Sequence, residues 1–344
     1  MPGVLVFSSV YRPPFDEGVK RVVRHLHLEL ARRIETTLVT LDRGPVEDAE
    51  AVPDGPWGFV RGLRRVCRTA RPDAVLYVPD AYLDRHTAVR LGLVRLAVGQ
   101  RRIGVLTLQP NVFDLPTRMM LRLWKPDVLF TQTETDAGVC ARFGIGYKVL
   151  SPAVDAERFR PCADAAEKVA LRRKYGLPED GRLCLHVGHI RRTRNVEWLV
   201  RLRLPPDAHL VVVGSRTRAL EQDAKEALIN HGATIVDSFV PTIEDLYRLA
   251  DAYLFPVQDP YAAIEMPLSV LEAMACNLPV VSTPFWGLVR CFEGVPGVYF
   301  AETAEAFGNA VRRALDGPAP ETRQAVQHLS WERLAGEVLE SLIR

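Results

Sequence analysis

The sequence lacks several features that would each place it in a definite class of protein. It has no stretch of about 18 uninterrupted apolar residues, so we expect no membrane-spanning helix. The six cysteines, at positions 67, 140, 162, 184, 276 and 291, include no Cys-x-x-Cys pair. That argues against a zinc site or a disulfide framework. The opening residues, MPGVLVFSSV, have no basic segment before the apolar one, so we expect no signal peptide and a cytoplasmic location.

What is present is the composition of an ordinary globular protein. The 344 residues are 48% hydrophobic and 25% charged, and a chain of this length is expected to form two domains. Charge is uneven: residues 1–150 hold 22 Lys and Arg against 16 Asp and Glu, whereas residues 151–344 hold 22 against 26. The basic first half indicates an anionic partner or a membrane surface. Ordinary surface variation explains the same counts equally well.

Short apolar runs alternate with amphipathic helical stretches along the whole chain. Runs such as VLVF at 4–7 and VLYV at 75–78 are continuous, which is typical of strands buried on both faces of a parallel sheet. The strand signals vanish between 156 and 180, and the same rhythm then restarts with LCLHV at 183–187. The pattern predicts two doubly wound α/β units in series.

Ligands of open α/β sheets bind beyond the carboxyl ends of the strands, so the joints between strands and helices matter most. The first joint carries a lone Gly18 and no Gly-x-Gly-x-x-Gly, so the fingerprint of a dinucleotide cofactor is missing. Gly18 either lets a ligand approach the backbone or relieves a tight turn, and by itself it favours the turn.

A basic loop follows the strand at 183–187. In HVGHIRRTRNVEWL, at 186–199, Gly188 is followed by His189, Arg191, Arg192 and Arg194 where a helix opens. Free amides and the helix dipole add to side-chain charge there, and the guanidinium fork suits phosphate. The loop is therefore a candidate anion site, with a solvated basic loop as the alternative.

The stretch EMPLSVLEAMACNLPVV, at 265–281, predicts a short helix that begins near Pro267 and ends at Asn277. Its first turn would offer the unpaired amides of Leu268, Ser269 and Val270. Glu272 follows among residues that look buried, and a buried carboxylate needs a specific partner. A favourable interaction with the helix N-terminus is the ordinary explanation of such an acid. The combination with an anion-binding helix end indicates a site.

Four blocks, in order along the chain, resemble the family-4 retaining nucleotide-sugar glycosyltransferases of GT-B fold (glycosyl transferases group 1). They are SPAVDAERFRP at 151–161, the basic loop at 186–199, DLYRLADAYLFPVQ at 245–258 and the stretch at 265–281. FDEGVKRV at 15–22 is similar to the glycine loop of the family's first domain, and LSWERLA at 329–335 to its final helix.

The resemblance implies an α/β, GT-B architecture in which two Rossmann-like doubly wound parallel-sheet domains face a central cleft. Residues 1–160 would form the acceptor-side domain and 161–325 the nucleotide-sugar domain, with a helix at 326–344 returning to the first. A nucleoside-diphosphate sugar would be the donor substrate, with no resident cofactor. No Asp-x-Asp occurs, which agrees with a metal-independent reaction and no metal site.

Carried over residue by residue, the resemblance makes Glu272 the acid that binds the ribose hydroxyls. Arg194 matches the phosphate-loop lysine, His189 stands in place of that loop's arginine, and Arg191 compensates for the weaker imidazole. Gly18 would face the donor phosphate.

The sequence also departs from the family in three other places. Ala153 replaces a glycine, and Ile264 occupies the position of the first motif acid, with Glu265 one residue later. Either Glu265 still reaches the donor sugar or the contact is lost; we favour the former because a loop before a helix absorbs a register shift. Asp80, with Tyr82, replaces a histidine expected near the reacting sugar.

We therefore expect a retaining, hexosyltransferase-type glycosyltransferase acting on a small-molecule or lipid-linked acceptor. A pseudo-glycosyltransferase and an inactive sugar-nucleotide binder share the fold and stay open. A nicotinamide-dependent oxidoreductase is disfavoured by the missing glycine fingerprint. Nucleic-acid binding is poorly supported because the basic residues are not interleaved with aromatic ones.

One segment bears on the membrane. LPTRMMLRLWKPD, at 115–127, sets methionine, leucine and tryptophan side chains among Arg118, Arg122 and Lys125. A basic amphipathic segment can lie on anionic lipid, which would make the protein peripheral on the inner membrane face. Core packing with arginines at the rim is the commoner explanation.

Overall fold

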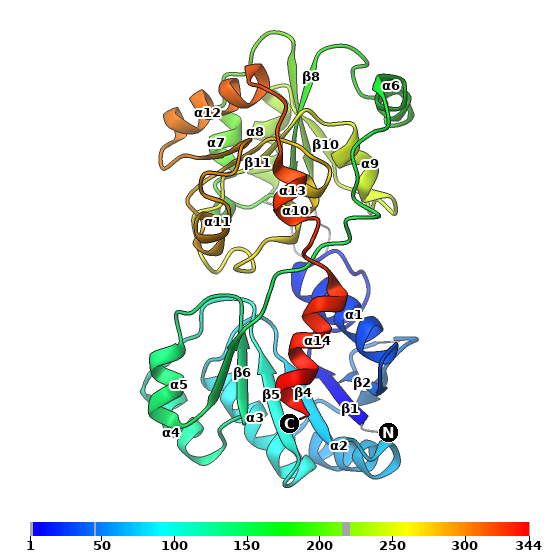
Figure 1. The fold of residues 1–344 in the computed structure, drawn as a ribbon, viewed down its shortest axis with the longest axis vertical. Helices are drawn as coiled ribbons and strands as arrows, with labels where there is room; N and C mark the ends of the chain where they lie inside the picture. Colours follow the sequence, from blue (N-terminus) through cyan, green and yellow to red (C-terminus); the bar gives the residue numbers. More distant parts are fainter. Residues whose placement is uncertain (1–2, 45, 215–220, 344) are drawn as a thin grey trace. The chain divides into compact units, whose positions relative to one another are not determined.

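The chain forms two compact units in a computed structural model that describes residues 3–44, 46–214 and 221–343 (Figure 1). Unit 1 comprises residues 1–152 and 331–344, and unit 2 comprises residues 153–330. The sequence analysis set the boundaries at 160/161 and 325/326. The difference arises because both short segments pack into the core of unit 2, where Val154, Phe159, Val326 and Leu329 are buried.

Unit 1 contains a seven-stranded sheet of order β3-β2-β1-β4-β5-β6-β7, and its strands pair in parallel. Its strands are β1 (Gly3–Ser8), β2 (Glu35–Leu41), β3 (Glu50–Val52), β4 (Ala74–Val78), β5 (Arg102–Leu106), β6 (Val128–Thr131) and β7 (Gly146–Val149). Its helices are α1 (Gly18–Ala31), α2 (Pro56–Ala70), α3 (Arg85–Val98), α4 (Leu115–Leu123), α5 (Ala137–Phe143) and α14 (Trp331–Leu342).

Unit 2 contains a six-stranded parallel sheet of order β10-β9-β8-β11-β12-β13. Its strands are β8 (Arg182–Val187), β9 (Ala208–Val213), β10 (Thr234–Val236), β11 (Ala252–Phe255), β12 (Val280–Ser282) and β13 (Val298–Phe300). Its helices are α6 (Ala165–Lys174), η1 (Arg192–Arg194), α7 (Val196–Val200), α8 (Gln222–Asn230), α9 (Ile243–Arg248), α10 (Leu268–Ala275), α11 (Trp286–Phe292), α12 (Ala304–Asp316) and α13 (Thr322–Val326).

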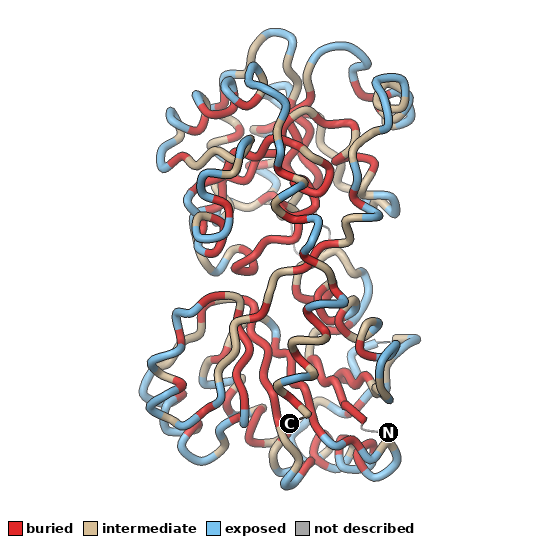
Figure 2. The backbone as a smooth tube through the Cα atoms, in the orientation of Figure 1, coloured by how far each residue is buried: buried red, intermediate tan, exposed pale blue. Residues whose placement is uncertain are grey.

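Counted from the first strand of each unit, both sheets follow the Rossmann order 3-2-1-4-5-6, and unit 1 adds a seventh strand, β7, beside β6. The two doubly wound α/β units expected from the apolar runs are thereby confirmed. The runs become central strands because every residue of β1 and of β4 is buried. Figure 2 shows the buried backbone following the strands of both units.

The last helix, α14, completes unit 1 rather than unit 2. It packs against α1, and the Trp331 ring stacks on His25 with ring centroids 4.7 Å apart. Its far end reaches the sheet, where a Cβ on Gly104 would be 2.9 Å from Leu342 Cδ1. Within the described ranges, every helix is too short or too polar to cross a bilayer.

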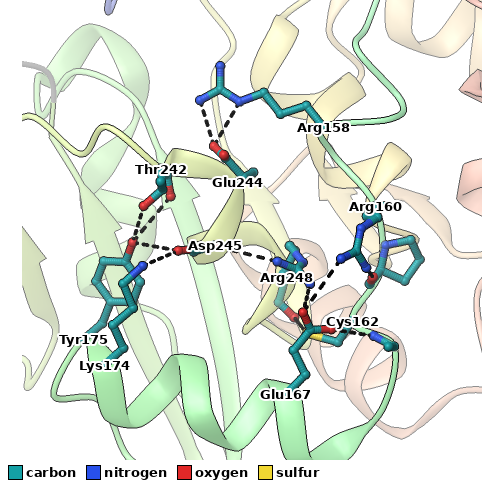
Figure 3. A network of polar contacts seen from close by, with 12 residues as sticks. Arg158, Arg160, Cys162, Glu167, Lys174, Tyr175, Thr242, Glu244, Asp245 and Arg248 are labelled. Carbon is teal, nitrogen blue, oxygen red and sulfur yellow. Dashed lines mark hydrogen bonds and ion pairs between the residues drawn. The ribbon is translucent and has the colours of Figure 1, made fainter.

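A polar network fastens the start of unit 2 to α9 (Figure 3). The Arg158 guanidinium donates to Glu244 at 2.7 and 3.0 Å, and Lys174 Nζ donates to Asp245 at 2.7 Å. Arg248 forms an ion pair with Glu167 of α6. These contacts tie the segment after residue 153 to unit 2.

Candidate functional site

The strand order of each sheet reverses at one place, and in open α/β sheets such switch points are where ligands bind. In unit 2 the switch lies between β8 and β11, and in unit 1 between β1 and β4. The candidates from the second half of the sequence follow β8 and β11, so the topology directs them to one edge of the sheet.

Arg194 folds back over the residue that ends β8. A Cβ on Gly188 would lie 2.4 Å from Arg194 Nη1, so only glycine leaves room for this guanidinium. The loop is held there by Asn195, which has a left-handed φ of 52° and donates from Nδ2 to Pro256 O at 3.0 Å. The basic loop is thus pinned to the end of β11.

Tyr253 of β11 connects this loop to the start of α10. Its hydroxyl donates to Val187 O at 3.3 Å and shares a side-chain hydrogen bond with Ser269. Burial raises the pKa of Tyr253, while the positive charge of Arg194 lowers it and the negative charge of Glu272 raises it. The charges of Arg194 and Glu272 therefore both act on one phenol. We call Gly188, Arg194, Tyr253, Ser269 and Glu272 the Tyr253 cluster.

Helix α10 begins at Leu268 after Pro267, where the sequence predicted. Its end is also as predicted, since Asn277 has a left-handed φ of 56°. One prediction was wrong: the Val270 amide donates to Pro267 O at 3.0 Å, because the first turn closes tightly. It is therefore not available to an anion, which leaves Leu268 and Ser269 as the candidate amides.

Two carboxylates are buried near the start of α10. Glu265 and Glu272 are each only 2% exposed. The main chain of Glu265 packs against α11, where a Cβ on Gly287 would lie 3.4 Å from Glu265 O. Ile264, at the position of the family's first acid, is buried as well. Glu265 is the acid of this segment, and its burial distinguishes it from a solvated loop residue.

The other cations of the basic loop face a different element. Arg191 Nε lies 3.8 Å from Glu221 Oε1, and Arg192 forms an ion pair with Asp223 at the start of α8. Each of these two arginines thus has an acid beside it. His189, which follows Gly188 directly, is half-buried. Of the arginines in this loop, the structure brings Arg194 to the Tyr253 cluster.

His186 was missed by the sequence analysis. It is fully buried in β8, and its Nδ1 donates to Leu254 O at 2.8 Å. Its Nε2, which then carries a lone pair, would lie 3.4 Å from a Cβ on Gly188 and finds no hydrogen-bond partner among the described residues. Burial lowers the pKa of His186 to about 4, and the charge of Arg194 adds to this effect. The imidazole of His186 is therefore neutral, and it lies near the guanidinium of Arg194, since both approach Gly188.

The two candidates from the first half of the sequence lie in unit 1. Gly18 is the first residue of α1, and Asp80 is exposed two residues beyond β4. Both follow strands of the unit 1 switch point, β1 and β4. In the part of the chain that the structure describes, no group of three or more His, Cys, Asp or Glu side chains is placed to hold a metal ion.

The Tyr253 cluster joins a cationic guanidinium, two hydroxyls, the start of a helix and a buried carboxylate. Arginine and helix amides favour an oxyanion, whereas a carboxylate accepts hydrogen bonds from hydroxyl groups. A ligand with a phosphate at one end and vicinal hydroxyls at the other suits this arrangement.

A family model matches part of this chain, and curated proteins are similar to it. Residues 181–317, which lie in unit 2 and contain the Tyr253 cluster, match the family model described as glycosyl transferases group 1. A D-inositol 3-phosphate glycosyltransferase of Salinispora arenicola is 29% identical over 291 residues, covering 74% of this chain and 61% of that protein. A D-inositol 3-phosphate glycosyltransferase of Xylanimonas cellulosilytica is 30% identical over 151 residues, covering 41% of this chain and 35% of that protein. The chain thus spans about one to two thirds of the length of these curated relatives.

Solved structures match over the whole chain and show that the fold is GT-B. Sucrose-phosphate synthase of Thermosynechococcus elongatus has a TM-score of 0.78 at 18% identity, covering 100% of this chain and 99% of that one. Anabaena HepE in complex with UDP-glucose has a TM-score of 0.74 at 13% identity, and the match covers 100% of both chains. A trehalose-phosphate synthase of Burkholderia xenovorans in complex with glucose 6-phosphate has a TM-score of 0.71 at 14% identity. The match covers 99% of this chain and 100% of that one.

Proposed function

We propose that this protein is a glycosyltransferase that moves a sugar from a nucleoside-diphosphate donor to a small-molecule acceptor. The observation that carries the proposal is that Tyr253 bonds to Val187 and Ser269, beside the Gly188–Arg194 approach, and feels the charges of both Arg194 and Glu272. The same unit matches the glycosyl transferases group 1 model, and HepE, of similar fold, was solved with UDP-glucose.

In this proposal, Arg194 and the amides of Leu268 and Ser269 hold the diphosphate. Negative charge grows on the diphosphate as the bond to the sugar breaks, and preorganised donors stabilise that charge most strongly in a water-poor site. Gly188 matters because it lets Arg194 approach the backbone. The positive charge comes from the chain itself, so we propose that the leaving group needs no metal ion.

Glu272 would accept hydrogen bonds from the ribose hydroxyls. Its burial favours this role, because a buried carboxylate gains most from hydroxyl donors that replace water. Glu265, which lies one residue after the position of the family's first motif acid, would hold the hydroxyls of the donor sugar. Retention of the anomeric configuration and transfer of a hexose follow from the family resemblance and belong to the proposal.

The acceptor is proposed to be a small polyhydroxylated molecule. The curated relatives are named for inositol 3-phosphate, and the Burkholderia structure contains glucose 6-phosphate. Asp80, exposed beyond β4 at the switch point of unit 1, is the candidate to meet an acceptor hydroxyl. A lipid-linked acceptor is the alternative.

The test is the binding of uridine and guanosine diphosphate, measured by calorimetry. Arg194→Ala is expected to weaken binding about 10- to 150-fold, the loss of about 1.5–3 kcal/mol from a charged hydrogen bond. Arg192→Ala removes the same charge from the same loop, but its guanidinium pairs with Asp223, so we expect little change. Glu272→Gln, which keeps the shape of the buried side chain, should weaken binding by about 10-fold or more.

If Arg194→Ala and Glu272→Gln both bind as the wild type does, the assignment is wrong. Release of nucleoside diphosphate from a panel of nucleotide sugars then separates a transferase from an inactive sugar-nucleotide binder. An inactive binder would respond to both substitutions yet turn over no donor with any acceptor.

A further inference from the structure

Helix α4 exposes a continuous apolar stripe. Leu115, Met119 and Leu123 are exposed by 72%, 55% and 69%, and they follow one another at intervals of four residues. Single exposed apolar residues are common, but three on one face of a nine-residue helix form a patch. The α4 helix lies at the periphery of unit 1 (Figure 1).

The stripe is not the result of a loosely attached helix. Thr117 and Leu121 are fully buried, and at about 100° per residue they lie on the side opposite the stripe. Asp114 caps the helix by accepting from the Thr117 amide at 2.9 Å. The helix is therefore fixed by one face and presents the other to its surroundings.

Helix α3, the neighbour of α4, also exposes apolar side chains. It packs closely on α4, since a Cβ on Gly92 would be 2.7 Å from the Trp124 ring. Val89 and Leu96 lie within about 60° of Gly92 on the helix and are exposed.

Cations flank the stripe. Arg118 and Arg122 are both exposed and lie one position before Met119 and Leu123. The surrounding sequence is basic as well: residues 51–150 hold 15 Lys and Arg against 8 Asp and Glu. Asp114 at the helix start is the acid closest in sequence to the stripe.

We propose that the α4 face, made of Leu115, Met119, Leu123, Arg118 and Arg122, docks on the surface of an anionic phospholipid bilayer. Leucine and methionine side chains would enter the boundary between headgroups and acyl chains, while the arginines bind lipid phosphates. A second copy of the chain fits less well, because a contact between two such faces would bring four arginines together, and the face itself holds no acid to pair with them. The proposal is independent of the proposed transferase activity.

The experiment is the sedimentation of the full chain with vesicles of equal parts phosphatidylglycerol and phosphatidylcholine, compared with vesicles of phosphatidylcholine alone. The wild type should bind the anionic vesicles, and added salt should weaken binding. The Arg118→Gln/Arg122→Gln variant should partition about 30-fold less. Replacing Leu115, Met119 and Leu123 with serine should reduce partition at least about 30-fold.

Two matched controls make the test specific. Arg61→Gln/Arg65→Gln on α2 removes the same charge at the same spacing from another exposed surface of unit 1. Leu28→Ser removes an apolar side chain that is 48% exposed on α1. Both should bind as the wild type does, and far-ultraviolet circular dichroism should confirm that each variant is folded.

The proposal is overturned if the wild type does not bind anionic vesicles. It is also overturned if the double arginine variant on α2 loses as much vesicle binding as the double arginine variant on α4. It is equally overturned if light scattering shows a dimer that the serine variant abolishes, because the stripe would then be covered by a second copy. Equal binding to both vesicle types would also contradict the role of the arginines.

Discussion

His186 is an ionisable side chain that is completely enclosed in β8. An imidazole in water takes up a proton near pH 6.5, whereas burial lowers the pKa of His186 to about 4. The unfolded chain therefore binds a proton between these two values that the folded chain does not. Stability must fall as the pH drops through this window.

We expect His186 to account for roughly 3 kcal/mol of the stability that is lost between about pH 6.5 and pH 4. The measurement is the free energy of unfolding in urea at several pH values in that range. His186→Asn should flatten the dependence, since the amide can still donate to Leu254 O but does not titrate. An equally steep decline in the variant would show that another group is responsible.

The proposed contact between Glu265 and the donor sugar can be tested by a substitution that removes only its charge. If Glu265 holds the donor sugar, Glu265→Gln should lower kcat by roughly 100-fold, as when one transition-state contact is lost. The affinity for nucleoside diphosphate should stay unchanged, because that ligand lacks the sugar. Near-normal turnover would mean that the shifted acid takes no part.

At the scale of elements, the site depends on how closely η1 approaches the end of β8. Gly188→Ala would place a methyl group 2.4 Å from Arg194 Nη1, so the guanidinium must move away. We expect nucleoside diphosphate affinity to fall about 10-fold or more, while the fold is retained because the displaced group is the end of a flexible side chain. Calorimetric titration of the variant would measure this.

Gly308→Ala is the control for that substitution. Gly308 lies in α12 of the same unit, where a Cβ would meet only Leu202 Cδ1, at 3.7 Å. Alanine in a helix should stabilise unit 2 by about 0.5–1 kcal/mol and leave binding unchanged. If both variants bound equally well, the close approach of Arg194 would be irrelevant to the ligand.

At the scale of the whole molecule, the units divide the chain unequally along the sequence. Unit 2 is one continuous segment, whereas unit 1 needs α14, which buries Trp331, Leu334 and Val338 against it. A chain that ends at Ser330 would leave those contacts unmade. At roughly 1.5–3 kcal/mol for each large buried side chain, unit 1 should lose about 5 kcal/mol or more.

We therefore expect residues 153–330 to fold alone and to bind nucleoside diphosphate in a manner that Arg194→Ala weakens. Residues 1–330 should show early melting of unit 1 by calorimetry, with the transition of unit 2 unchanged. Failure of the isolated segment to bind would mean that the Tyr253 cluster is insufficient by itself, and that residues of unit 1 are needed for the diphosphate.

The sequence by itself determined the two parallel sheets and the course of α10. Continuous apolar runs can be buried only between two layers of helices. Helix α10 must end at Asn277, because this residue accepts the left-handed conformation and Pro279 cannot continue the helix. It also identified Arg194, Ser269 and Glu272 as candidate site residues, because strand-to-helix joints of such sheets lie at one edge.

Only the tertiary structure decided which of these residues meet. Tyr253 looks like one more residue of an apolar strand, yet its hydroxyl joins β8 to α10 because those elements flank the switch point. Arg191 and Arg192 belong to the same basic loop as Arg194, but the start of α8 brings Glu221 and Asp223 to them. The partner of a charge depends on which elements pack together, and residues distant along the chain settle that packing.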